Sequence, residues 1–244
     1  MEICVDNIES AINAVTGGAH RLELCSALSE GGLTPSLGLF KTLKTMIDIP
    51  IFVMLRPKSG YDFEYSDLEM KVILKDLTLF KDAGADGFVF GALSSGNIDK
   101  VACSSIILAA DPLPVTFHRA FDVVTNNPLK MAKEISDMGF KRLLTSGRCS
   151  LAVSGIDLIK DLVEAMKDSL IIIPGSGINV GNLESILVRT SVREFHTSAK
   201  VLKQNVSTNS ICLDSNGKAH LVYVTQSNIV RELLNIYKNC TEQH

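Results

Sequence analysis

The chain has 244 residues, of which 46% are hydrophobic and 21% are charged, and this balance excludes disordered, collagen-like and low-complexity proteins. A formal net charge of −3 leaves no basic excess to neutralise phosphates, so the composition is not that of a nucleic-acid-binding protein. No apolar run reaches the ~20 residues that cross a bilayer, no signal peptide opens the chain, and six cysteines are too few for a disulfide framework, so we expect a cytoplasmic protein with no membrane contact.

Eight short runs of β-branched and apolar residues are predicted strands, and a helical pattern follows each of them. In chain order these strands are Ile3–Val5, Arg21–Cys25, Ile51–Leu55, Gly87–Phe90, Val115–His118, Arg142–Thr145, Leu170–Ile173 and Glu194–Thr197. Parallel strands need crossover helices, so this alternation is typical of a parallel sheet. No linker rich in proline, glycine or serine divides the chain. The sequence therefore predicts a single α/β domain over residues 1–244, a TIM-type (β/α)8 barrel.

Boundary signals support this reading and weigh against the alternative, an open doubly wound sheet. Such a sheet favours a glycine-rich turn after its first strand, whereas Asp6-Asn7-Ile8-Glu9 has no glycine and resembles a capping box with Asp6 as the cap. Ser66-Asp67-Leu68-Glu69 predicts a second capped helix. Residues 211–223 read as two short strands around Asn216-Gly217, which predicts a β-hairpin insertion before a last helix at Gln226–Tyr237.

Polar residues gather at the predicted carboxyl ends of the strands, where barrels of this type carry their active sites. Side chains alternate along a strand, and this alternation directs several polar or sulfur-bearing side chains into the barrel. These residues are Glu2, Cys4, Glu23, Cys25, Met54, Arg56, Thr116, His118, Glu194 and His196. Such a lining is costly to bury unless its groups are paired or bind something. We therefore expect a pocket bounded by Glu23, Arg56, His118 and the loop Gly175–Gly177.

Two chemical interpretations compete for this pocket. In the first, Cys4 and Cys25 on neighbouring strands form a metal site with Met54 nearby, because thiolate and thioether ligands select copper(I). In the second, the pocket belongs to an enzyme whose general acid and base are His118 and Glu23.

The enzyme interpretation needs an anion site, for which the loop Pro174–Asn179 is the candidate. Backbone N–H groups in this loop, and a helix start capped by Asn179, are suited to hold a phosphate after the seventh strand. Arg56 is a candidate anion clamp. The predicted anion-binding set is Arg56, Gly175, Ser176, Gly177 and Ser198.

Each candidate also has a structural interpretation. Cys4 and Cys25 are also typical of small buried hydrophobic residues. Glu23 and Arg56 are a candidate structural ion pair. His118 and His196 are also typical of hydrogen-bonded core histidines. It is the joint occurrence of these residues at one end of the predicted barrel that favours a functional site.

At these positions the sequence resembles the CutC family of copper homeostasis proteins. The motifs that carry the resemblance are Glu2–Asp6, Arg21–Ser36, Val53–Pro57, Gly87–Leu93, Pro114–Asp122, Leu143–Gly147, Pro174–Ile178 and Glu194–Ala199. The resemblance implies a TIM barrel and copper(I) binding, with Cys4 and Cys25 as the ligands. It also implies a location in the cytoplasm and partly in the nucleus. Ser176 departs from the glycine that is common in the family, and the segment 201–224 is not well matched.

We therefore expect a copper(I)-binding protein of copper homeostasis with its metal ligands at Cys4 and Cys25. The alternative is a TIM-barrel lyase, isomerase or hydrolase that acts on a small anionic or phosphorylated substrate at Glu23, Arg56 and His118. The expected partners are a copper ion, a small anionic ligand and further copies of this chain in a dimer or tetramer.

Overall fold

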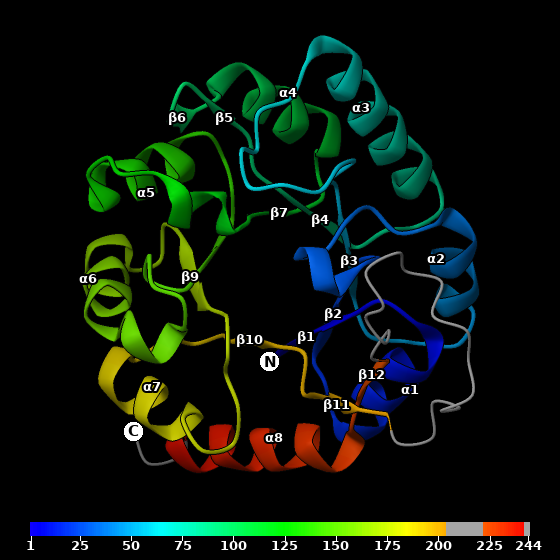
Figure 1. The fold of residues 1–244 in the computed structure, drawn as a ribbon, viewed down its shortest axis with the longest axis vertical. Coiled ribbons are helices and arrows are strands. Elements are labelled where there is room, and N and C mark those ends of the chain that lie inside the picture. The colour runs from blue at the N-terminus through cyan, green and yellow to red at the C-terminus, as the bar shows by residue number, and fades with distance from the viewer. Residues whose placement is uncertain (204–221, 242–244) are drawn as a thin grey trace, which may run out of the picture.

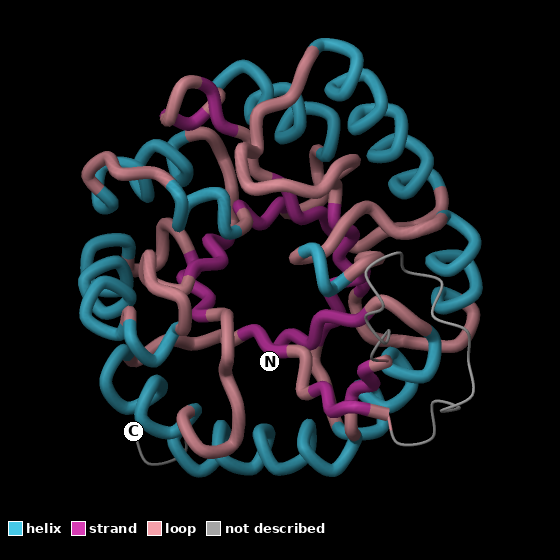
Figure 2. Tube along the Cα trace, viewed as in Figure 1, coloured by secondary structure: helices cyan, strands magenta, loops and turns pink. Residues whose placement is uncertain are grey.

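The computed structural model describes residues 1–203 and 222–241, and in them eight parallel strands form a nearly closed barrel surrounded by helices (Figures 1 and 2). The strands pair in the order β10-β1-β2-β3-β4-β7-β8-β9. Their bounds are β1 Glu2–Val5, β2 Arg21–Leu24, β3 Ile51–Met54, β4 Gly87–Phe90, β7 Val115–Phe117, β8 Arg142–Thr145, β9 Ile171–Pro174 and β10 His196–Thr197. This arrangement confirms the predicted barrel, because β1 pairs with both the second strand and the last strand of the set.

A helix follows each barrel strand and packs on the outside of the barrel. The helices are α1 Ile8–Gly17, α2 Leu37–Lys44, α3 Asp67–Asp82, α4 Lys100–Ala110, α5 Pro128–Asp137, α6 Ile156–Met166, α7 Leu183–Thr190 and α8 Ser227–Thr241. No helix within the described residues is long and apolar enough to span a membrane. Two small antiparallel pairs lie outside the barrel: β5 Leu93–Ser94 with β6 Asn97–Ile98, and β11 Lys200–Leu202 with β12 Tyr223–Thr225.

The helix caps agree with the sequence in part. Ser66 and Glu69 form the predicted capping box at the start of α3. The cap of α1 is Asn7, whose side chain accepts from the Ser10 N–H group, so the prediction of Asp6 as the cap is wrong. Asp6 instead accepts from the Asn7 amide and from the Leu28 backbone N–H group, which ties the start of α1 to the loop after β2.

Two further predictions concern the carboxyl-terminal third of the chain. Asn179 does not cap a helix, because α7 starts at Leu183 and Asn182 occupies its N-cap position. The predicted hairpin at residues 211–223 falls largely outside the described residues. Tyr223, which is described, lies in β12 and pairs with Leu202 of β11.

The predicted alternation of side chains is confirmed by two separate hydrophobic clusters. A large cluster between strands and helices includes Ile3, Leu22 and Leu24. A small cluster inside the barrel contains Cys25, Phe52, Met54 and Val89. Residues that alternate along one strand therefore belong to different layers, and the polar residues of the same parity face the interior.

Charged side chains close the amino-terminal end of the barrel. Arg21 donates to Glu2 and Glu194 at 2.6 Å each, and Arg142 donates to Glu194 at 3.0 Å. The guanidinium groups of Arg21 and Arg142 lie 4.9 and 5.5 Å from the centre of the Phe52 ring. These side chains fill the amino-terminal end of the barrel interior. Open space therefore lies toward the carboxyl ends of the strands.

Candidate functional site

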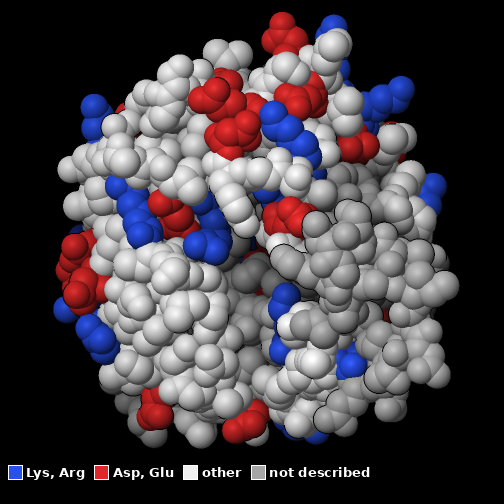
Figure 3. Space-filling model, in the orientation of Figure 1, with Lys and Arg blue, Asp and Glu red and all other residues white. Residues whose placement is uncertain are grey.

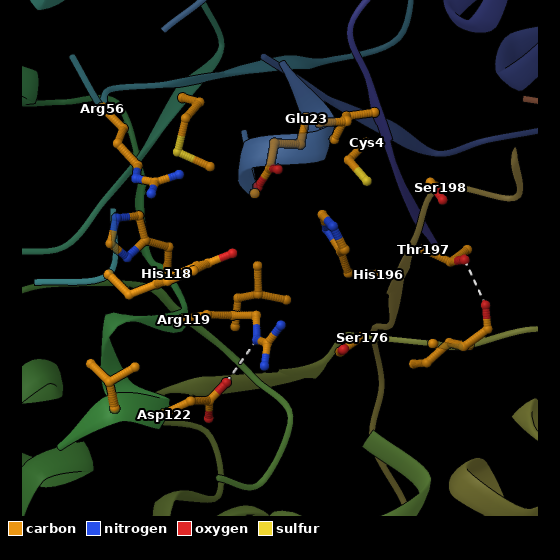
Figure 4. Close-up of a pocket in the computed structure, with 18 of the residues that line it drawn as sticks. Cys4, Glu23, Arg56, His118, Arg119, Asp122, Ser176, His196, Thr197 and Ser198 are labelled. Atoms are coloured by element: carbon orange, nitrogen blue, oxygen red, sulfur yellow. Dashed lines mark hydrogen bonds and ion pairs between the residues drawn. The ribbon is translucent and has the colours of Figure 1, made fainter. Parts of the chain in front are cut away.

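The carboxyl ends of the strands surround a cavity of about 610 Å³ (Figure 4). A hollow with basic side chains near its rim is visible from this side in Figure 3. Nine of the residues singled out from the sequence line this cavity, namely Cys4, Glu23, Met54, Arg56, His118, Ser176, Gly177, His196 and Ser198. Cys25 and Gly175 are not part of its lining. The structure thus brings most members of both predicted sites to one place.

The two cysteines differ in their access to the cavity. Cys4 lines it and is 7% exposed, whereas Cys25 is fully buried. The Cys25 thiol donates to the Val5 carbonyl at 3.5 Å. Gly32 covers it so closely that a Cβ atom at Gly32 would lie 3.4 Å from the Cys25 sulfur. Burial, with Glu23 and Cys4 nearby, raises the pKa of the Cys25 thiol well above its usual range, so Cys4 is the thiol that a ligand in the cavity meets first.

Three potential ligand groups meet beneath the cavity: within residues 1–203 and 222–241, atoms of Glu2, Glu23 and His196 lie within 4.8 Å of one another. Both oxygens of Glu2 are already engaged, one with Arg21 at 2.6 Å and one with His196 Nδ1 at 2.7 Å. Burial alone would raise the pKa of Glu2, but Arg21 and His196 lower it to about 2. Carboxylates are also hard ligands that do not select copper(I). This cluster is therefore an ion-pair network in which Glu2 holds His196 in place.

The other two members of this cluster, His196 and Glu23, shift each other's pKa. Burial alone would lower the pKa of His196, but Cys4, Glu23 and Glu2 raise it well above its usual range. Burial raises the pKa of Glu23 to about 7, against the opposing influence of His196. The Oε2 atom of Glu23 is buried and has no hydrogen-bond partner within the described residues. Glu23 is thus a carboxyl group whose proton state changes near neutral pH at the edge of the cavity.

We expect the Glu23→Gln variant to gain stability relative to the native protein as the pH rises from about 4.5 to 7. The pKa of Glu23 is about 7 when folded, above its unfolded value near 4.5, so the native protein loses stability as the pH rises through this window. Glutamine does not ionise. The difference should reach about 1–3 kcal/mol, and urea unfolding at several pH values measures it. A difference that does not vary with pH would show that Glu23 ionises normally.

Arg56 does not form the ion pair with Glu23 that the sequence suggested. Its guanidinium donates to the carbonyl oxygens of Glu30 at 2.7 Å and Gly32 at 3.0 Å, and also to that of Gly60. It also lies 5.3 Å from the centre of the Phe63 ring. Arg56 therefore joins the loop after β2 to the loop after β3, and its charge has no carboxylate partner within the described residues.

His118 faces the cavity next to Arg56 in Figure 4. Its Nδ1 accepts from the Ala120 N–H group at 3.2 Å, which places the proton of the neutral ring on Nε2. Burial and the nearby Arg56 lower the pKa of His118 to about 3, so the ring is neutral at physiological pH. Nε2 is buried without a partner within the described residues. His118 thus offers an unused N–H donor rather than a cationic acid.

The predicted anion loop follows β9, and its amides differ in their availability. The Gly175 N–H group donates to the Thr145 carbonyl, so it is not free to hold a ligand. Within the described part of the chain, the N–H groups of Ser176, Gly177 and Ser198 have no acceptor. The Ser176 hydroxyl donates to the Ser150 carbonyl at 2.7 Å. The loop therefore presents backbone N–H groups, not the serine hydroxyl.

Two charged residues of the lining, Asp122 and Lys200, were missed at the sequence level. Asp122 pairs with Arg119 at 2.8 Å and accepts from the Ser146 N–H group, so it fixes Arg119 at the cavity edge. Lys200 lines the cavity from β11, with its Nζ 5.0 Å from the centre of the Tyr223 ring. The sequence did hold a signal for Lys200, because it follows the predicted site residue Ser198 by two positions.

Comparisons with known proteins identify the family and agree with the fold. The family model described as the CutC family matches residues 1–201. A copper homeostasis protein cutC homolog from Homo sapiens is 51% identical over 201 residues, which cover 82% of this chain and 73% of the human protein. The Drosophila melanogaster homolog is 44% identical and covers 98% of this chain and 94% of its own length. A crystal structure of a CutC protein from Streptococcus agalactiae superposes with a TM-score of 0.77 at 31% identity, over 81% of this chain and 97% of that chain.

Proposed function

This chain belongs to the CutC family, and from that premise we propose that it binds copper(I) and takes part in copper homeostasis. The observation that carries the proposal is the position of Cys4, a thiol on the wall of a cavity. Thiolates are the ligands that favour copper(I) over hard cations.

Cys4 is the primary ligand in this proposal, and Cys25 is its partner on the neighbouring strand. Cys4 pairs in register with Glu23, two residues before Cys25. Cys25 binds the ion only after its thiol leaves the Val5 carbonyl and loses a proton, which its raised pKa opposes. His196 lies on the lining beside Cys4 and is suited to supply an imidazole nitrogen once it is neutral.

We therefore expect Cys4→Ser to weaken copper(I) binding more than Cys25→Ser does. Cys4→Ser should lower the affinity at least tenfold, because it removes the thiolate that faces the cavity. Cys25→Ser should have a smaller effect. The measurement is a competition titration with a colorimetric copper(I) chelator under anaerobic, reducing conditions.

Cys103→Ser is the matched control, because Cys103 is also buried but lies in α4, where its thiol points to the Ala92 carbonyl. It should leave the affinity unchanged. Equal affinity in the native protein and in the Cys4→Ser variant would place copper elsewhere and overturn the proposal.

The remaining expectations also belong to this proposal. We propose that the protein acts on copper in the cytoplasm and partly in the nucleus. We also propose that the chain assembles into a dimer or tetramer. Sedimentation at micromolar concentration tests the assembly, and a monomeric mass contradicts it.

A further inference from the structure

Copper(I) binding at Cys4 leaves most of the cavity unexplained. The lining extends from Cys4 and Glu23 to the loops after β9 and β10, and the space of about 610 Å³ is typical of sites for small organic molecules. Three features of this larger space point to a ligand other than copper.

The first feature is the group of free backbone donors at Ser176, Gly177 and Ser198. Their N–H groups have no acceptor within the described residues, and all three residues line the cavity. Ser176 and Gly177 have φ angles of +92° and +71°, so the chain turns sharply here. Successive free N–H groups in a turn form a concave site for an anion.

The second feature is the charge of the lining. Arg119 is neutralised by Asp122, but Lys200 and Arg56 have no carboxylate partner within residues 1–203 and 222–241. Glu23 is the remaining carboxyl group of the lining. The cavity therefore carries more positive than negative charge, which favours an anionic ligand.

The third feature is a pair of polar atoms that lack partners, Glu23 Oε2 and His118 Nε2. Both residues are 3% exposed and line the cavity. Figure 4 shows Glu23 beside Cys4 on one side of the cavity and His118 beside Arg56 on the other. Buried polar groups without partners are rare, so a ligand that supplies hydrogen bonds to both atoms explains their position.

We propose that this cavity binds a small phosphorylated molecule. Its phosphate group is held by the N–H groups of Ser176, Gly177 and Ser198 with Lys200. Its hydroxyl or carbonyl end lies between Glu23 and His118. His118 donates a hydrogen bond from Nε2 to this end of the ligand, and Glu23 forms a second hydrogen bond to it through Oε2.

Inorganic phosphate tests the first half of this proposal. The metal-free protein, kept reduced, is titrated with phosphate by calorimetry. Lys200→Met should weaken the affinity about tenfold or more, because it removes one charged hydrogen bond to the anion. Lys203→Met is the matched control, because Lys203 lies on the same segment but pairs with Glu9 at 2.6 Å and is not part of the lining. It should leave the affinity unchanged.

The loop itself is tested by Ser176→Gly. This change keeps the backbone N–H group and suits the positive φ angle, so phosphate affinity should be retained. No phosphate binding by the native protein, or equal losses in the two lysine variants, would overturn the phosphate site. A large loss in Ser176→Gly would overturn the role given to the backbone.

Glycerol 3-phosphate tests the second half. The native protein should bind it at least tenfold more tightly than inorganic phosphate, and Glu23→Leu should remove this advantage while phosphate affinity stays the same. Circular dichroism and thermal unfolding check that the variant is folded. Equal affinities for the two probes in the native protein, or an advantage that persists in Glu23→Leu, would confine the site to the phosphate group and overturn the role of Glu23.

Discussion

Replacing Arg56 by methionine should lower the free energy of unfolding by about 1–3 kcal/mol. Arg56 is 3% exposed and donates to the carbonyl oxygens of Glu30, Gly32 and Gly60. Methionine fills similar space but leaves the buried Gly32 carbonyl without its donor, and a buried group left unpaired costs about 1–3 kcal/mol, whereas water can reach the carbonyls of the exposed residues Glu30 and Gly60. Chemical unfolding in urea, followed by circular dichroism, measures the change.

The same variant should loosen the cavity wall, because Arg56 connects the loop after β2 to the loop after β3. Gly32 belongs to the first of these loops and covers Cys25, so the Cys25 thiol should react faster with a thiol reagent in Arg56→Met. Arg189→Met is the control, because Arg189 forms a surface pair with Asp157 and should change stability by no more than about 0.5 kcal/mol. Native-like stability in Arg56→Met would mean that the Arg56 side chain faces solvent in the cavity, as its predicted role as an anion clamp requires.

The barrel was predictable because short strand-like runs and longer helical patterns of apolar residues alternate along the chain. Apolar residues at alternate strand positions, such as Leu22 and Leu24, specify the face that packs on the helices, so Glu23 has to face inward. The cap of α1 was missed by one residue. Asp6 and Asn7 are equally good caps by composition, and only the loop after β2, which uses Asp6 as an acceptor for Leu28, decides between them.

The site was predictable as a set of residues but not as a set of partners. Strand parity placed Arg56 and Glu23 in one cavity, yet it could not show that backbone carbonyls from two loops occupy the Arg56 guanidinium. Likewise, parity turned Cys25 inward, but the cover that Gly32 provides depends on the folding of residues 26–33, where Ser26 pairs with Leu33. Such contacts arise between distant segments and leave no local sequence pattern.

The cavity combines two chemistries that rest on different residues. Cys4, a soft ligand, lies near Glu23 and His196 (Figure 4), whereas the backbone N–H groups proposed to hold a phosphate belong to the loops after β9 and β10. A change at Cys4 should therefore affect copper(I) and leave phosphate affinity intact, while Lys200→Met should do the reverse. The two proposals fail independently of each other.

The second large effect is expected at the closed end of the barrel, where Glu2→Gln should lower the free energy of unfolding by about 3–5 kcal/mol. Glu2 is fully buried and accepts from Arg21 and His196. Glutamine has nearly the same shape, so the loss reflects charge rather than packing. Arg21 keeps Glu194 as a partner, but His196 loses the carboxylate that stabilises its cationic form.

The pH dependence distinguishes this loss of charge from a general packing defect. The folded pKa of Glu2 is about 2, below its unfolded value near 4.5, so its contribution is complete above pH 4.5 and is lost as the pH falls through 2. The difference between native protein and Glu2→Gln should therefore be largest near neutral pH and shrink between about pH 4.5 and 2. Glu9→Gln, which breaks an exposed pair with Lys203, is the control and should show little difference at any pH. A Glu2→Gln deficit that stays constant down to pH 2 would mean that shape, not the buried carboxylate charge, is what this end of the barrel requires.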